Sequence, residues 1–181
     1  MQLGKNRINN LQADCFTRVY HETVTTAKTS MTISNLADDA HEVYILRCKF
    51  VNGYDGAANY LLRPNNVSTA DNYGRQTLSG INATITAARA TATGFLLGTN
   101  AAITNICYVD NELYAKSGFV RTLIQRNANS IATTTVTDIY LIGQSWNNTA
   151  DEITSLVILA DQTNGIGVGS EISLYKLTRK T

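Results

Sequence analysis

The chain has 181 residues, enough for one domain with a substantial buried core. Fifteen Lys and Arg residues balance fourteen Asp and Glu residues, so no positive excess indicates a nucleic-acid partner. No apolar run reaches the roughly 18 residues of a membrane span, so we expect no membrane insertion. Charged residues make up 16% of the chain, against about 25% in a typical domain. Abundant Thr, Asn, Ser and Ala instead favour a β-rich protein that works outside a cell or in an assembly.

The first 14 residues are polar and lack the apolar core of a signal peptide. We therefore expect the protein to fold in a cytoplasm, with a short N-terminal arm (1–14) ahead of one domain (15–181). The arm cannot bury enough surface to fold alone. It is either a disordered tail, as chain ends often are, or an anchor that becomes ordered on a particle. The candidate anchoring residues are Leu3, Lys5, Arg7, Ile8 and Leu11.

From residue 16 onward, short segments rich in β-forming residues alternate with turn signals such as Asn-Gly, Asp-Gly and Asn-Asn. Regular short strands without a long helix predict an all-β fold, and a jelly-roll-like β-sandwich of about eight to nine strands fits best. The segments predicted as strands are 16–27, 30–36, 42–51, 59–63, 103–109, 119–126, 133–142, 152–160 and 171–177.

One stretch, residues 81–93, combines helix-favouring Ala with strand-favouring Thr. Ile81, Ala83, Ile85 and Ala87 alternate, which favours a strand followed by a loop around Gly94. A short helix remains the alternative.

The glycine-rich stretch Gly165-Ile166-Gly167-Val168-Gly169 raises the question of a nucleotide site. A dinucleotide fingerprint needs the spacing GxGxxG at the start of a helix. Here the spacing is GxGxG and a β-rich segment follows, so we expect a turn between two strands that binds no nucleotide.

No residue pattern indicates catalysis, a metal or a cofactor. The only histidines are His21 and His41, and no GxSxG elbow supports a serine triad. The cluster 38–42, with His41 between acidic residues, could hold a hard cation, but a solvated turn is the ordinary interpretation. Three widely spaced cysteines predict small buried side chains rather than disulfides or a zinc site. They are Cys15, Cys48 and Cys107.

Trp146 follows the predicted strand 133–142 and precedes two asparagines. A tryptophan at a strand end either packs in the core or stacks on a sugar. Core packing is the commoner role, and the alternative is a ligand platform of Trp146, Asn147 and Asn148.

Near its C-terminus the chain carries Trp146-Asn147-Asn148-Thr149, 152–156, Gly165 to Ser170 and 172–176, with Tyr44-Ile45-Leu46, 62–66 and Asn72-Tyr73 upstream. In their order and spacing these residues resemble a β-sandwich module found in tailed-bacteriophage virions, whose C-terminal end has a short strand, a Gly-rich turn and a closing Leu-Tyr-Lys strand. The resemblance spans roughly residues 16–177.

This resemblance implies a non-catalytic head-decoration, tail or fibre protein, often trimeric. Unlike a long fibre, the chain is almost entirely this one module. We therefore expect a structural virion protein, made in the host cytoplasm, that decorates the capsid or tail as a homotrimer in contact with other virion proteins. The alternative is an adhesion module that binds a receptor or a host-surface glycan.

Overall fold

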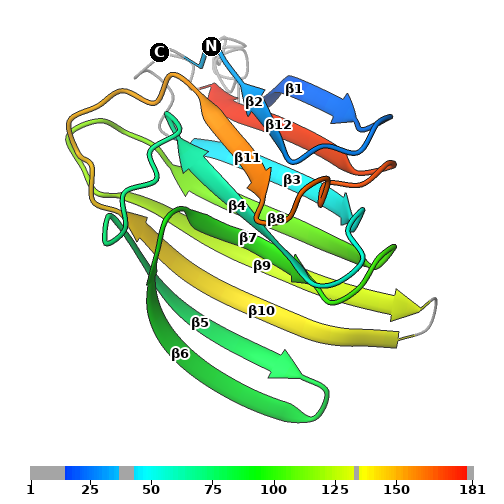
Figure 1. Cartoon of the computed structure of the whole chain (residues 1–181). Helices are drawn as coiled ribbons and strands as arrows, with labels where there is room; N and C mark the ends of the chain where they lie inside the picture. The colour runs from blue at the N-terminus through cyan, green and yellow to red at the C-terminus, as the bar shows by residue number, and fades with distance from the viewer. Residues whose placement is uncertain (1–14, 37–42, 133–134, 179–181) are drawn as a thin grey trace, which may run out of the picture.

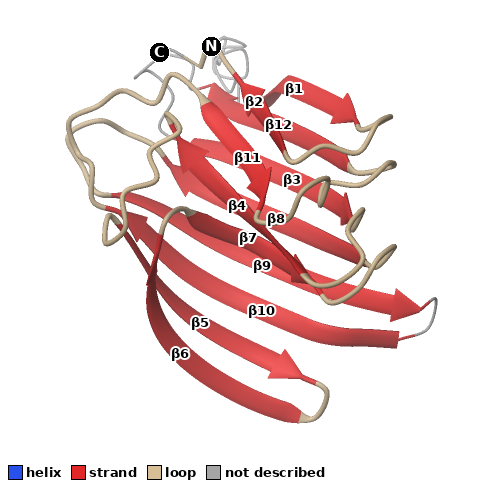
Figure 2. Cartoon of the chain, in the orientation of Figure 1, coloured by secondary structure: helices blue, strands red, loops and turns tan. Residues whose placement is uncertain are grey.

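The computed structural model describes residues 15–36, 43–132 and 135–178. Within these residues the chain forms strands, turns and loops without a helix (Figure 2), so no helix there could span a membrane. The twelve strands are β1 (Cys15–Thr23), β2 (Ser30–Ile33), β3 (Val43–Val51), β4 (Ala58–Pro64), β5 (Tyr73–Ile81), β6 (Thr84–Ala92), β7 (Phe95–Asn100), β8 (Ile106–Tyr114), β9 (Arg121–Ala132), β10 (Thr135–Trp146), β11 (Leu156–Ala160) and β12 (Glu171–Thr178).

The strands form two antiparallel sheets of unequal width that pack face to face (Figure 1). The large sheet has eight strands in the order β1-β12-β3-β8-β9-β10-β5-β6, and the small sheet has the order β2-β11-β4-β7. The small sheet covers only part of the large one, so β5 and β6 extend beyond it (Figure 1). The prediction of an all-β sandwich is confirmed.

Two hairpins widen the large sheet. Without β5–β6 and β9–β10, the eight remaining strands alternate between the layers along the chain, except that the consecutive strands β4 and β7 both lie in the small sheet. They form two four-stranded sheets, β1-β12-β3-β8 and β2-β11-β4-β7. The hairpin β9–β10 joins the large sheet beside β8, and the hairpin β5–β6 joins beside β10.

The core lies where the two sheets overlap, because alternating side chains of each sheet turn toward the other layer. In β4, every second residue from Ala58 to Pro64 is buried. Phe50 of the large sheet stacks on Tyr60 of the small sheet, with ring centroids 4.1 Å apart. We call the side of the large sheet that faces the small sheet its inner face, and the opposite side its outer face.

The strand predictions hold best where apolar residues alternate. The predicted segments match β1 to β4, β9, β10 and β12 with shifted ends, while β8 and β11 begin several residues later than predicted. The stretch 81–93 is strand, as the alternation indicates, although Ile81 ends β5 and the turn at Asn82-Ala83 precedes β6. The prediction misses β5 and β7, so the count of eight to nine strands is too low.

The glycine-rich stretch is a loop between β11 and β12, as predicted. Of the three glycines in this stretch, only Gly169 has positive φ, at 85°. A need for positive φ therefore does not explain the other two. Gly167 is required because the chain passes another segment closely: a Cβ there would lie 2.8 Å from both the Val51 carbonyl oxygen and the Gly53 nitrogen. The Gly167 N–H donates to that same Val51 oxygen at 2.8 Å.

We expect Gly167→Ala to lower the free energy of unfolding by about 1–3 kcal/mol, because the added methyl group would force two backbone segments apart. Chemical denaturation measures this. Gly143→Ala is the control, since a Cβ at Gly143 meets nothing within 4 Å, and it should change stability by less than about 0.5 kcal/mol. Saturable binding of NAD or ATP that Gly167→Ala abolishes would contradict the interpretation of this loop as structural.

Candidate functional site

The outer face of the large sheet is the most distinctive surface in the described part of the chain. The small sheet packs on the opposite side, and the outward residues of the central strands are exposed. Tyr108 is 54% exposed, Ile124 47% and Leu141 49%. Charged residues gather over β12, β3, β8 and β9, while apolar residues gather over β10, β5 and β6. The face thus divides into a charged half and an apolar half.

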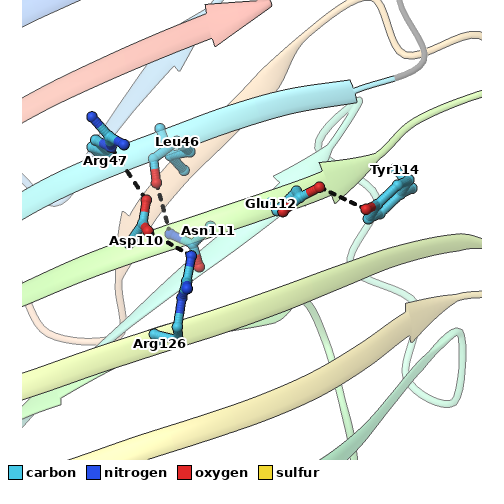
Figure 3. Close-up of polar contacts among 7 residues, drawn as sticks. All are labelled: Leu46, Arg47, Asp110, Asn111, Glu112, Tyr114 and Arg126. Carbon is cyan, nitrogen blue, oxygen red and sulfur yellow. Dashed lines mark hydrogen bonds and ion pairs between the residues drawn. The ribbon is translucent and has the colours of Figure 1, made fainter. Parts of the chain in front are cut away.

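The charged half holds a shared ion pair across three strands (Figure 3). Asp110 of β8 lies between Arg47 of β3 and Arg126 of β9, its two cross-strand partners. Arg47 donates through Nε to one carboxylate oxygen at 3.3 Å, and Arg126 donates through a terminal nitrogen to the other at 2.8 Å. One carboxylate therefore positions two guanidinium groups on the sheet surface.

A second ion pair lies beside the first. Lys49 of β3 donates to Glu171 of β12 at 2.8 Å. The hydrogen bond from Lys49 lowers the pKa of the Glu171 carboxyl, and the same bond raises the pKa of the Lys49 ammonium. Both groups are therefore charged at neutral pH and largely neutralise one another.

These residues line an open hollow of about 620 Å³, which we call the arginine hollow. Its lining also includes the two tyrosines Tyr108 and Tyr175 and the small residues Ser173 and Ala128. The Arg47 guanidinium carbon lies 5.9 Å from the centre of the Tyr175 ring. This volume is within the ordinary range of small-ligand sites, about 300–1,000 Å³.

The apolar half is carried by the hairpin β5–β6 and the neighbouring strand β10, which together we call the wing. Leu141 lies directly opposite Leu78, and Ile139 lies opposite Gly80, which in turn pairs with Ile85. These side chains share the outer face because the cross-strand register aligns them. Their exposed fractions are 49% for Leu141, 48% for Leu78, 59% for Ile139 and 78% for Ile85.

The end of the wing is a single layer. Every residue from Ile81 to Arg89 is exposed, including both faces of β6. Strand β6 is the last strand of the sheet, so one of its edges has no neighbour within the described chain. Its only charged residue is Arg89 and it contains no proline, although natural edge strands are commonly protected by charge or proline. This hairpin thus exposes two faces and one unprotected edge.

Trp146 does not form a ligand platform. It is fully buried on the inner face at the end of β10, because that strand continues four residues beyond the predicted end. Its ring stacks near Tyr73 at 6.1 Å between centroids. Asn148 is engaged in the following turn, where its side-chain oxygen accepts the backbone N–H of Ala150 at 3.1 Å. Only Asn147 is exposed, so the platform hypothesis is wrong and the core interpretation of Trp146 is correct.

The other predicted residues are dispersed. The arm with its candidate anchoring residues and the cluster 38–42 lie outside the described residues. His21 is on the outer face of β1, where its ring nitrogen is 2.9 Å from the Ser173 hydroxyl. Cys48 and Cys107 are buried and free of disulfides, as predicted, and burial raises the pKa of both thiols. In the described residues, no three His, Cys, Asp or Glu side chains are grouped to hold a metal ion.

Sequence reasoning misses Arg47, Asp110 and Arg126, because they meet only when the distant strand β3 pairs with β8 of the consecutive strands β8 and β9. Each lies in an alternating segment whose exposed positions are expected to be polar. The only available signal is the pairing of opposite charges once the register is known.

The chain matches no protein-family model, no curated protein and no solved structure.

Proposed function

We propose that the protein is a non-catalytic structural component of a tailed-bacteriophage virion, assembled as a closed homo-oligomer on the capsid or tail. A trimer fits the resemblance of the sequence to virion modules. The protein would be made in the host cytoplasm and contact other virion proteins. The observation that carries the proposal is the wing, whose apolar outer face and unprotected edge are suited to a partner.

The wing would gain from a partner because every residue from 81 to 89 is exposed, so this end of the hairpin buries little apolar surface within the chain. Nine residues in β6 span roughly 30 Å, and three strands are about 14 Å wide, so the outer face of the wing offers about 400 Å². Stable protein interfaces bury about 800 Å² per partner. The outer face of the wing supplies about half of this area, and the exposed end of the hairpin, residues 81–89, would add its second face and free edge to the contact.

The strand order supports a virion role because it fits that of a fold common in viral capsid proteins. Apart from β4 and β7, which are both in the small sheet, eight strands alternate between the layers and form sheets β1-β12-β3-β8 and β2-β11-β4-β7. We infer a jelly roll widened by the two hairpins, because a jelly roll is an eight-stranded, two-layer fold common in viral capsid proteins. Since one fold serves many functions, this is support by analogy.

Two measurements test the proposal. Light scattering after size exclusion should give the mass of a closed oligomer, and gold-labelled antibodies should mark virions at symmetric positions. Virions without the label would contradict the structural role. A monomer in solution and on the particle would contradict the oligomer.

The arm provides a separate prediction. A chain that starts at Asp14 should keep the thermal midpoint of the full protein, because residues 1–13 are too polar to add to the core. If the arm is an anchor, the shortened protein should no longer rebind particles stripped of the native protein. Rebinding as tight as that of the full chain would show that docking uses the sandwich surface instead.

A further inference from the structure

We propose that the arginine hollow binds an acidic saccharide, with Arg47 and Arg126 holding the sugar carboxylate and Tyr108 supporting the ring. This site uses the charged half of the outer face, whereas the proposed assembly uses the wing. The inference therefore does not depend on the structural role of the protein.

The two arginines are positioned before any ligand arrives. Asp110 takes one hydrogen bond from each guanidinium, at 3.3 Å and 2.8 Å. Because a guanidinium has five N–H donors, both arginines keep donors for a ligand. A planar guanidinium matches the two oxygens of a carboxylate. Holding the side chains in place reduces the entropy lost when a ligand binds.

The charge of the hollow favours an anion. The cations Arg47, Lys49 and Arg126 outnumber the carboxylates of Asp110 and Glu171 by one. Lys49 and Glu171 are already paired at 2.8 Å, so the excess positive charge belongs to the arginine pair. A ligand with a single carboxylate group would balance it.

The remaining lining fits a sugar ring. Tyr108 is 54% exposed and lies directly opposite both Lys49 and Ala128 on the neighbouring strands. An exposed tyrosine offers an apolar ring face and a polar hydroxyl, which suits the C–H face and hydroxyl groups of a pyranose. The small residues Ala128 and Ser173 leave space beside it.

Isothermal titration with trigalacturonic acid tests the proposal, and its fully methyl-esterified form serves as the neutral counterpart. We expect saturable binding of the acid, at least about 10-fold tighter than of the ester. Arg47→Gln and Arg126→Gln should each weaken binding of the acid about 10-fold, the effect of one lost charge-assisted hydrogen bond. Tyr108→Ala should weaken binding of both forms.

The matched control is Arg89→Gln, which removes one positive charge from the same outer face outside the arginine hollow. It should leave the affinity unchanged. Circular dichroism confirms that each variant is folded. The proposal is overturned if the acid does not bind, if the ester binds equally well, or if Arg89→Gln weakens binding as much as Arg47→Gln. Equal affinity for inorganic phosphate would show that the arginine hollow binds anions in general, which would overturn the proposed specificity for an acidic saccharide.

Discussion

Arg121→Ala should lower the free energy of unfolding by about 3–5 kcal/mol, because it leaves buried carbonyl groups without their donor and opens a cavity in the core. Arg121 is fully buried, and its guanidinium donates to the backbone carbonyls of Ala115, Asn148 and Asp151. It also lies 5.6 Å from the centre of the Trp146 ring. The substitution would leave three carbonyls without this donor and open a cavity beside the indole.

Thermal unfolding monitored by circular dichroism measures this effect, and we expect the midpoint to fall by about 6–20 °C. Arg126→Ala is the matched control on the same strand, since its side chain is 67% exposed and paired with Asp110 on the surface. That control should cost no more than about 1 kcal/mol. Equal losses of stability for the two variants would show that Arg121 does not anchor the loops that follow β8 and β10.

The double variant Leu78→Lys, Leu141→Glu should convert the proposed oligomer into a monomer. The two residues face each other across β5 and β10 at the centre of the apolar outer face. Burying a charged pair there would cost desolvation energy that the apolar pair does not. Within the monomer, opposite charges at paired positions are compatible with the sheet, so the fold should survive. Light scattering gives the mass, and circular dichroism checks the fold.

The control carries the same two charges in a different place. Phe119 and Val168 are exposed apolar residues, at 64% and 59%, in loops outside the wing. The variant Phe119→Lys, Val168→Glu should keep the oligomer mass. If the wing variant stays oligomeric, the interface lies elsewhere. A wild-type protein that is already monomeric would reject the oligomer itself.

The sequence pattern predicts the β-sandwich class because apolar alternation and turn residues can be identified without knowing which strands pair with one another. Alternation identifies β3 and β4, where every second side chain is apolar and buried, and the start of β12, where Ile172 and Leu174 are. The turn at Asn65-Asn66 is equally local: both residues have left-handed φ, at 51° and 57°, a conformation that asparagine tolerates well.

Alternation fails where polar residues enter the core. The segment Gly143-Gln144-Ser145 suggests the end of a strand, yet β10 continues to Trp146. Gln144 is buried because its side chain accepts the Leu96 N–H at 2.7 Å and donates to the Leu96 carbonyl at 2.8 Å. Those bonds make burial of the amide tolerable. The bonding partner belongs to β7, which the sequence pattern did not predict.

By itself, the sequence determined that the chain forms short strands with Asn- and Gly-based turns and that the glycine-rich stretch joins two of them. Only the tertiary structure decided which faces are covered. Arg121 and Arg126 lie five residues apart on one strand, and one is buried while the other is exposed. Alternation places them on opposite faces, but only the position of the small sheet makes one face the core. Likewise, the register of β3, β8 and β9 alone brings Arg47, Asp110 and Arg126 together.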